Sequence, residues 1–216
     1  LRVLSLLLPL LAVSGCSGGT FSAYATSTPT PSIYKHWSVA HPKTVSSKEF
    51  KMALKSVLRH KDSFNGQVEY ASGSPDTLML RAASGYVALD PGIASIGAGS
   101  PYYFEMVSTF LGTEWLFFDS FDLKSSRGRM HYEVDQTGKN EQAQVGGVYE
   151  VSSETFSDEE AQRFCGVISG QNIQLRLNGT MTSLQSPVVS VPGRVQAMYL
   201  NICTLYFGQD QGLKIP

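Results

Sequence analysis

Runs of alternating apolar and polar residues occupy the middle of this 216-residue chain and place the strongest limit on its fold. Between positions 130 and 135, Met130, Tyr132 and Val134 alternate with polar residues. Because successive side chains of a strand point to opposite faces, this alternation predicts a strand with one buried face. Several such strands bury their apolar faces together only by packing as layers, so the pattern favours a fold built on sheets.

Further strand-forming segments lie on both sides of this one. They occupy residues 67–71, 77–83, 85–89, 102–111, 114–121, 145–151 and 172–177. The turn at 72–76 predicts a hairpin of the first two segments, and Gly112 predicts a hairpin of 102–111 with 114–121. Residues 92–101 are rich in glycine and predict a flexible loop. We therefore expect seven or eight strands.

Three segments have helical patterns. Ser46 and Glu49 form a capping box before an apolar stripe that reaches Leu58. Acidic residues follow Ser157 at the start of a second helix, and residues 194–207 carry a third apolar stripe that ends before Gly208. Together with the strands, these helices predict a mainly β fold, an antiparallel β-sandwich with two or three peripheral α-helices. An α+β arrangement is the alternative.

Two of the three cysteines, Cys165 and Cys203, fall on the second and third predicted helices beside their apolar stripes. They form an even pair, as expected of a disulfide in an oxidising compartment. Two separately buried thiols are the alternative, since free cysteine is often buried.

The first fifteen residues have the layout of a signal peptide: Arg2, then a run of apolar and small residues that is too short to cross a bilayer. The sequence Val13-Ser14-Gly15-Cys16 resembles the bacterial lipobox. This resemblance implies lipidation of Cys16, cleavage before it and membrane attachment through the lipid. Ser17 after the cysteine resembles lipoproteins of the outer membrane that face the periplasm in double-membraned bacteria.

The domain organisation follows from this anchor. Residues 1–15 are the predicted signal peptide, and 16–33 contain the lipidated cysteine and a tether rich in Ser, Thr and Pro. Residues 34–216 are then one globular domain. Within it, residues 115–173 loosely resemble uncharacterised β-sandwich domains of bacterial envelopes: an aromatic strand at Trp115, a charged hairpin, an acid-capped helix and the strand QLRLNG. This resemblance brings no catalytic motif.

The charge balance argues against nucleic acid as a partner. The chain carries 17 Lys and Arg against 18 Asp and Glu, and binding to a phosphate backbone needs clustered cations. The densest basic stretch contains five cations between Lys48 and Lys61 and is interpreted as the solvated side of a helix.

No catalytic template fits the chain, and we expect no cofactor. A serine-nucleophile elbow, a phosphate-binding loop, a dinucleotide fingerprint and a zinc-protease motif are absent from the sequence. The acids Asp119 and Asp122 could meet His131 and Glu133 if their strands pair, but an unbulged strand would place the two aspartates on opposite faces. The sequence therefore predicts no metal site.

Aromatic residues give the remaining indication of function. Tyr102, Tyr103 and Trp115 belong to an aromatic-rich region and form a candidate contact patch for another envelope protein or a glycan. The leading hypothesis is a lipid-anchored envelope protein that is a non-enzymatic binding or assembly module. An envelope hydrolase with dispersed catalytic residues and a structural surface lipoprotein are the alternatives.

Overall fold

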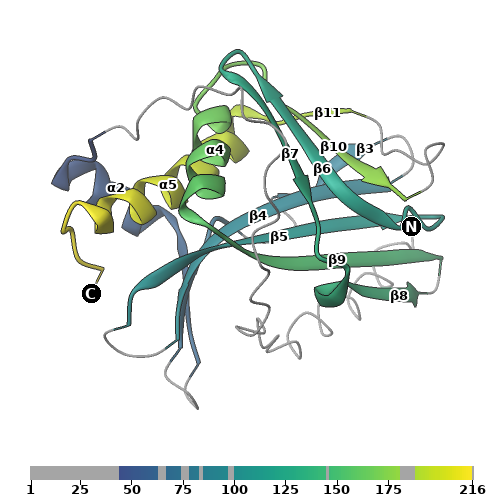
Figure 1. Cartoon of the computed structure of the whole chain (residues 1–216), viewed down its shortest axis with the longest axis horizontal. Coiled ribbons are helices and arrows are strands. Elements are labelled where there is room, and N and C mark those ends of the chain that lie inside the picture. Colours follow the sequence, from purple (N-terminus) through teal and green to yellow (C-terminus); the bar gives the residue numbers. More distant parts are fainter. Residues whose placement is uncertain are drawn as a thin grey trace, which may run out of the picture.

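The computed structural model describes residues 44–62, 67–73, 78–82, 85–96, 100–144, 146–180 and 188–215. The predicted signal peptide, the lipobox, the tether and residues 34–43 lie outside the described residues. Two antiparallel sheets pack against each other, and helices cover one end of the pair (Figure 1). The predicted class, a mainly β antiparallel sandwich with a few helices, is confirmed.

The larger sheet has seven strands, with neighbours in the order β1-β2-β4-β5-β9-β8 and β3 paired to β4. These strands are β1 (Leu58–Lys61), β2 (Val68–Ala71), β3 (Leu80–Ala82), β4 (Gly85–Ser95), β5 (Tyr102–Gly112), β8 (Asn140–Gln144) and β9 (Gly147–Phe156). The smaller sheet has the order β11-β10-β6-β7. Its strands are β6 (Phe118–Ser125), β7 (Gly128–Glu133), β10 (Gln174–Gly179) and β11 (Val189–Ser190).

The core lies between the inner faces of the two sheets and the helices. Alternate residues of β5, among them Phe104 and Met106, are fully buried, and Phe121 of β6 and Leu177 of β10 are fully buried as well. Burying a side chain of this size contributes about 1.5–3 kcal/mol. Polar residues, among them Asp122 and Arg176, alternate with the buried apolar residues of β6 and β10, so the smaller sheet has one apolar face and one polar face.

The helices are α2 (Ser47–Ser56), α4 (Asp158–Ile168) and α5 (Gly193–Asp210), and η1 (Gln136–Gly138) is a short 3-10 turn. A capping box starts α2, as the sequence predicts. The predicted start of α4 after Ser157 is confirmed, and Ser157 and Glu160 form a second capping box there. The α4 helix contacts strands of both sheets, while α5 contacts β4, β5, α2 and α4. A disulfide joins Cys165 of α4 to Cys203 of α5, with their Cα atoms 5.8 Å apart. Of the described helices, none is long and apolar enough to cross a membrane.

Several local predictions are wrong. The first helix ends at Ser56, and Leu58 begins β1 instead of extending the helix. Strands β2 and β3 both pair with β4, so they form no hairpin with each other. Strands β5 and β6 belong to different sheets, and residues 92–95 continue β4 where a loop was expected. Each error arises because the pairing of these strands depends on residues that are distant in the chain, and the local sequence does not specify that pairing.

Candidate functional site

The outer face of the smaller sheet gathers polar side chains from three strands. Asp122 of β6 is paired with His131 of β7 on one side and with Arg176 of β10 on the other. Ser120 of β6 is paired with Asn178 of β10. Residues directly opposite each other on neighbouring strands have Cβ atoms about 4.5–5.5 Å apart. The strand register therefore brings these five side chains together, and we name them with Asp119 the Asp122 network.

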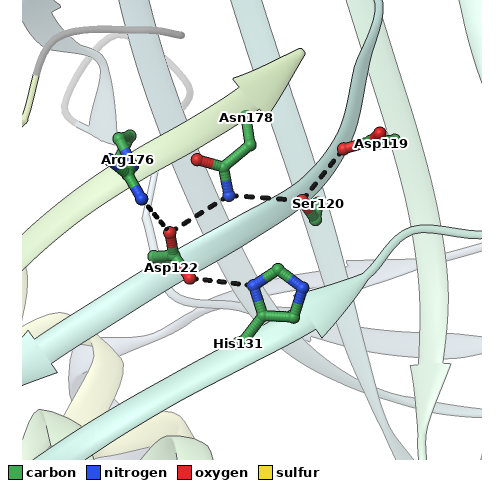
Figure 2. Close-up of polar contacts among 6 residues, drawn as sticks. All are labelled: Asp119, Ser120, Asp122, His131, Arg176 and Asn178. Carbon is green, nitrogen blue, oxygen red and sulfur yellow. Dashed lines mark hydrogen bonds and ion pairs between the residues drawn. The ribbon is translucent and has the colours of Figure 1, made fainter. Parts of the chain in front are cut away.

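Asp122 is the centre of the network (Figure 2). Its Oδ1 lies 2.8 Å from Nδ1 of His131. Its Oδ2 accepts hydrogen bonds from the guanidinium of Arg176 at 2.5 Å and from Nδ2 of Asn178 at 3.1 Å. The carboxylate thus holds an imidazole, a guanidinium and an amide in fixed positions on the sheet.

A β-bulge adds Asp119 to the network. Asn178 is paired with Ser120, but the next residue, Gly179, is paired with Phe118, so Asp119 is an extra residue in β6. The hydroxyl of Ser120 donates to Oδ1 of Asp119 at 2.9 Å and accepts from Nδ2 of Asn178 at 3.2 Å. The strand is bulged, and both aspartates therefore belong to one network, contrary to the placement expected of a regular strand.

The network sets the charge of its members. Partial burial alone would raise the pKa of Asp122, but hydrogen bonds from His131, Arg176 and Asn178 outweigh burial and hold this pKa well below its ordinary value of 3.8. The hydrogen bond to Asp122 raises the pKa of His131 above 6.5, against the effect of burial and with help from nearby carboxylates. Asp122 is therefore ionised at neutral pH, and His131 gains a proton more readily than a solvated histidine.

The network is open to a ligand. The side chains of Asp122, His131 and Arg176 are 32%, 26% and 35% exposed. Oδ1 of Asn178 is buried and receives no hydrogen bond from the described residues.

A second feature, the aromatic turn, precedes β6. We use this name for Trp115, Leu116 and Phe117. The rings of Trp115 and Phe117 are stacked, with centroids 5.5 Å apart, and Phe117 is 36% exposed. Phe117 also has φ of +49°, which is uncommon for a bulky residue. Backbone strain of this kind is found most often at functional sites.

Glu150 holds the aromatic turn in place from inside the protein. Its Oε1 accepts the backbone N–H groups of Leu116 at 2.6 Å and Phe117 at 2.9 Å, and its Oε2 accepts that of Phe118 at 3.1 Å. The Nζ of Lys139 lies 3.0 Å from Oε2. Glu150 is fully buried, and three N–H donors plus an ammonium compensate the loss of its hydration. This arrangement redirects the chain between β5 and β6.

The turn adjoins the network at one end. The backbone N–H of Thr180 donates to the carbonyl of Phe117 at 3.0 Å, two residues beyond Asn178. The β10 strand and the start of β6 thus connect the exposed aromatic pair to the polar row.

The structure does not bring Tyr102, Tyr103 and Trp115 together. The two tyrosines begin β5, whereas Trp115 follows the other end of this strand at Gly112. An eleven-residue strand is on the order of 30 Å long. Tyr102 packs near Tyr70, with ring centroids 5.9 Å apart. The three residues therefore form no single contact patch, because the segment that joins them is extended.

Sequence analysis did not identify Arg176, Asn178 or Glu150. The first two alternate with Leu175 and Leu177 in β10, so their outward direction could have been read from the sequence. Glu150 carried no such signal, because its alternation with its neighbours resembles that of a solvent-facing residue. Within the described ranges, no cluster of three or more His, Cys, Asp or Glu side chains could hold a metal ion.

Comparison of the chain with family models, with curated proteins and with solved structures finds no match.

Proposed function

We propose that this chain is a lipid-anchored protein of the bacterial cell envelope whose sandwich is a non-enzymatic binding module. The anchor rests on the lipobox-like sequence that ends at Cys16. Where the cell has two membranes, the protein is attached to the outer membrane and faces the periplasm. The binding surface is the Asp122 network.

One observation carries the binding role: an ionised carboxylate holds an imidazole, a guanidinium and an amide in one row on an open sheet face. Groups of this kind bind the hydroxyls of sugars through directed hydrogen bonds. The adjoining aromatic turn offers ring faces for the apolar sides of a sugar. The ligand class that fits both features is a hydroxyl-rich glycan of the cell envelope.

The same geometry favours binding over hydrolysis. A carboxyl pair in a glycan hydrolase needs one group with a raised pKa to act as the acid. The described carboxyls whose pKa is raised belong to the larger sheet and to α5, and none is a member of the network: Glu69, Asp90, Glu105, Glu154 and Asp210. The Ser120 hydroxyl donates to Asp119, so its proton is directed to a carboxylate and not to His131.

An NMR titration tests the binding surface. Soluble fragments of purified wall glycan, released by a muramidase, are added to the ¹⁵N-labelled protein. We expect the largest amide shifts in β6, β7 and β10 and in the aromatic turn. Shifts confined to the larger sheet would contradict the Asp122 network as the binding surface. An unchanged spectrum at a millimolar concentration of the fragments would contradict the binding of wall glycan.

Cell fractionation tests the anchor separately. The wild-type protein should partition with membranes and have the mass of a chain that starts at lipidated Cys16. The Cys16→Ala variant should leave the membrane fraction when the membranes are washed in 0.5 M salt, which screens any electrostatic attachment. A variant that stays with the membranes after this wash and is extracted only by detergent would contradict lipidation at Cys16.

A further inference from the structure

One side of α2 carries three lysines and an exposed apolar side chain. These residues follow the helical spacing i, i+3, i+4 and i+7, so they share one face. We name them the lysine face: Lys48, Lys51, Met52 and Lys55. All four are exposed, and Met52 is 60% exposed.

The opposite side of α2 fixes the direction of the lysine face. Phe50 and Ala53 are buried there, and the ring of Phe50 lies against Gly208 of α5. A Cβ on residue 208 would approach the ring carbon Cδ2 of Phe50 to 2.4 Å, so the two helices are in close contact. The carboxylate of Glu49 is turned back to the backbone N–H and hydroxyl of Ser46, at 3.0 Å and 2.7 Å. The helix is thus held with its lysines directed outward.

The charge of this region contrasts with that of the whole chain. The net charge of the protein is −1, but α2 and β1 together hold five of its 17 Lys and Arg residues and one acid. Clustered lysines next to a membrane are attracted to anionic headgroups, with about 1 kcal/mol for each cation near the surface.

We propose that the lysine face binds anionic lipid headgroups, with the Met52 side chain inserted between them. The lysines supply attraction to the headgroup charges, and Met52 loses its contact with water. The place of α2 in the chain agrees, because it is the first described element after Cys16. This inference rests on the proposed membrane attachment and adds a second, electrostatic contact, which orients the sandwich on the bilayer.

Vesicle sedimentation tests the contact without the lipid anchor. The processed chain, residues 16–216 with Cys16→Ser, is mixed with vesicles of 30% phosphatidylglycerol in phosphatidylcholine and with pure phosphatidylcholine. We expect binding to the anionic vesicles alone, and loss of binding in 0.5 M salt. Replacing Lys48, Lys51 and Lys55 by Gln should weaken binding about 100-fold, and Met52→Ser about fivefold.

The matched control removes the same charge elsewhere. Arg81, Lys124 and Arg129 are exposed and lie outside α2, and their replacement by Gln should change binding less than threefold. Circular dichroism verifies that both triple variants are folded. Equal losses in the two triple variants, equal binding to neutral vesicles or no vesicle binding would overturn the inference. Binding to soluble polyglutamate without vesicle binding would also overturn it and assign the face to an acidic protein. If the Cys16→Ala variant stays with the membranes while the vesicle results are as expected, only the proposed lipidation of Cys16 is contradicted.

Discussion

Asp122 and His131 lie directly opposite each other on neighbouring strands, and 2.8 Å separates the carboxylate Oδ1 from the imidazole Nδ1. The pKa of Asp122 is lowered and that of His131 is raised, so the charged forms of both are favoured in the folded protein. The stabilisation from Asp122 is fully present above pH 3.8, and it is lost as the pH falls through the pKa of Asp122 in the folded protein. The stabilisation from His131 is fully present below pH 6.5, and it is lost as the pH rises through the pKa of His131 in the folded protein.

The Asp122→Asn variant should therefore lower the pKa of His131. We expect the NMR titration midpoint of the His131 ring to lie above 6.5 in the wild type and to fall in the variant. The difference in unfolding free energy between the two proteins should be larger at pH 5.5 than at pH 9. The His131→Gln variant assigns the resonance. An unmoved midpoint would show that Asp122 does not set the protonation of this histidine.

Removing the buried carboxylate of Glu150 should destabilise the fold strongly. Glu150→Ala leaves three buried backbone N–H groups without their acceptor and leaves the Lys139 ammonium with Glu141 alone, and we expect a loss of about 3–5 kcal/mol in urea unfolding. Glu141→Gln is the matched control, because Glu141 is the exposed partner of the same lysine at 2.8 Å. The control should cost less than about 1 kcal/mol. Equal losses would contradict the role assigned to Glu150.

Substitution of Phe117 should change the free energy of unfolding little, and substitution of Phe118 should lower it strongly. Phe117→Gly relaxes a backbone at φ of +49° and removes a partly exposed ring, so the unfolding free energy should change by less than about 1 kcal/mol. Phe118 is fully buried, and Phe118→Ala should cost about 3–5 kcal/mol. A similar large loss at Phe117 would mean that its ring is a core element. Glycan binding by Phe117→Gly should still weaken, because the stacked pair is lost.

The disulfide between α4 and α5 should stabilise the protein measurably. It joins residues separated by 38 positions, and closing a loop of this length contributes about 4 kcal/mol through the unfolded state. The double variant Cys165→Ala, Cys203→Ala should show this loss in urea unfolding, and reductant should lower the stability of the wild type alone. A wild type that is indifferent to reductant after unfolding and refolding would contradict the bridge.

Much of the fold could be predicted because patterns within short segments of the sequence indicate strands and helix starts. Alternation predicted the buried and exposed sides of β7. The capping box at Ser46 predicted the start of α2, and the acidic residues after Ser157 predicted the start of α4. Strand partners were predicted less well, because pairing depends on residues that are distant in the chain. Strand β4 pairs with β2, β3 and β5, so no local turn could identify which of these neighbours form hairpins.

The candidate site was less predictable for the same reason. Asp122 and His131 meet through a hairpin, and their convergence was considered from the sequence. The bulge at Asp119 follows from the pairing of β6 with β10, a strand more than fifty residues later. The aromatic turn depends on Glu150, which lies 32 to 34 positions beyond the backbone groups that it binds. Neither feature leaves a signal in the segment that it shapes.

The affinity of Asp122→Asn for muramidase-released wall glycan fragments tests the central claim most directly. The proposal predicts binding at least tenfold weaker than that of the wild type, because the carboxylate positions His131, Arg176 and Asn178. Arg81→Gln, an exposed change on β3 of the larger sheet, should bind as the wild type does. Equal affinity of the wild type and Asp122→Asn would contradict a recognition surface centred on this residue.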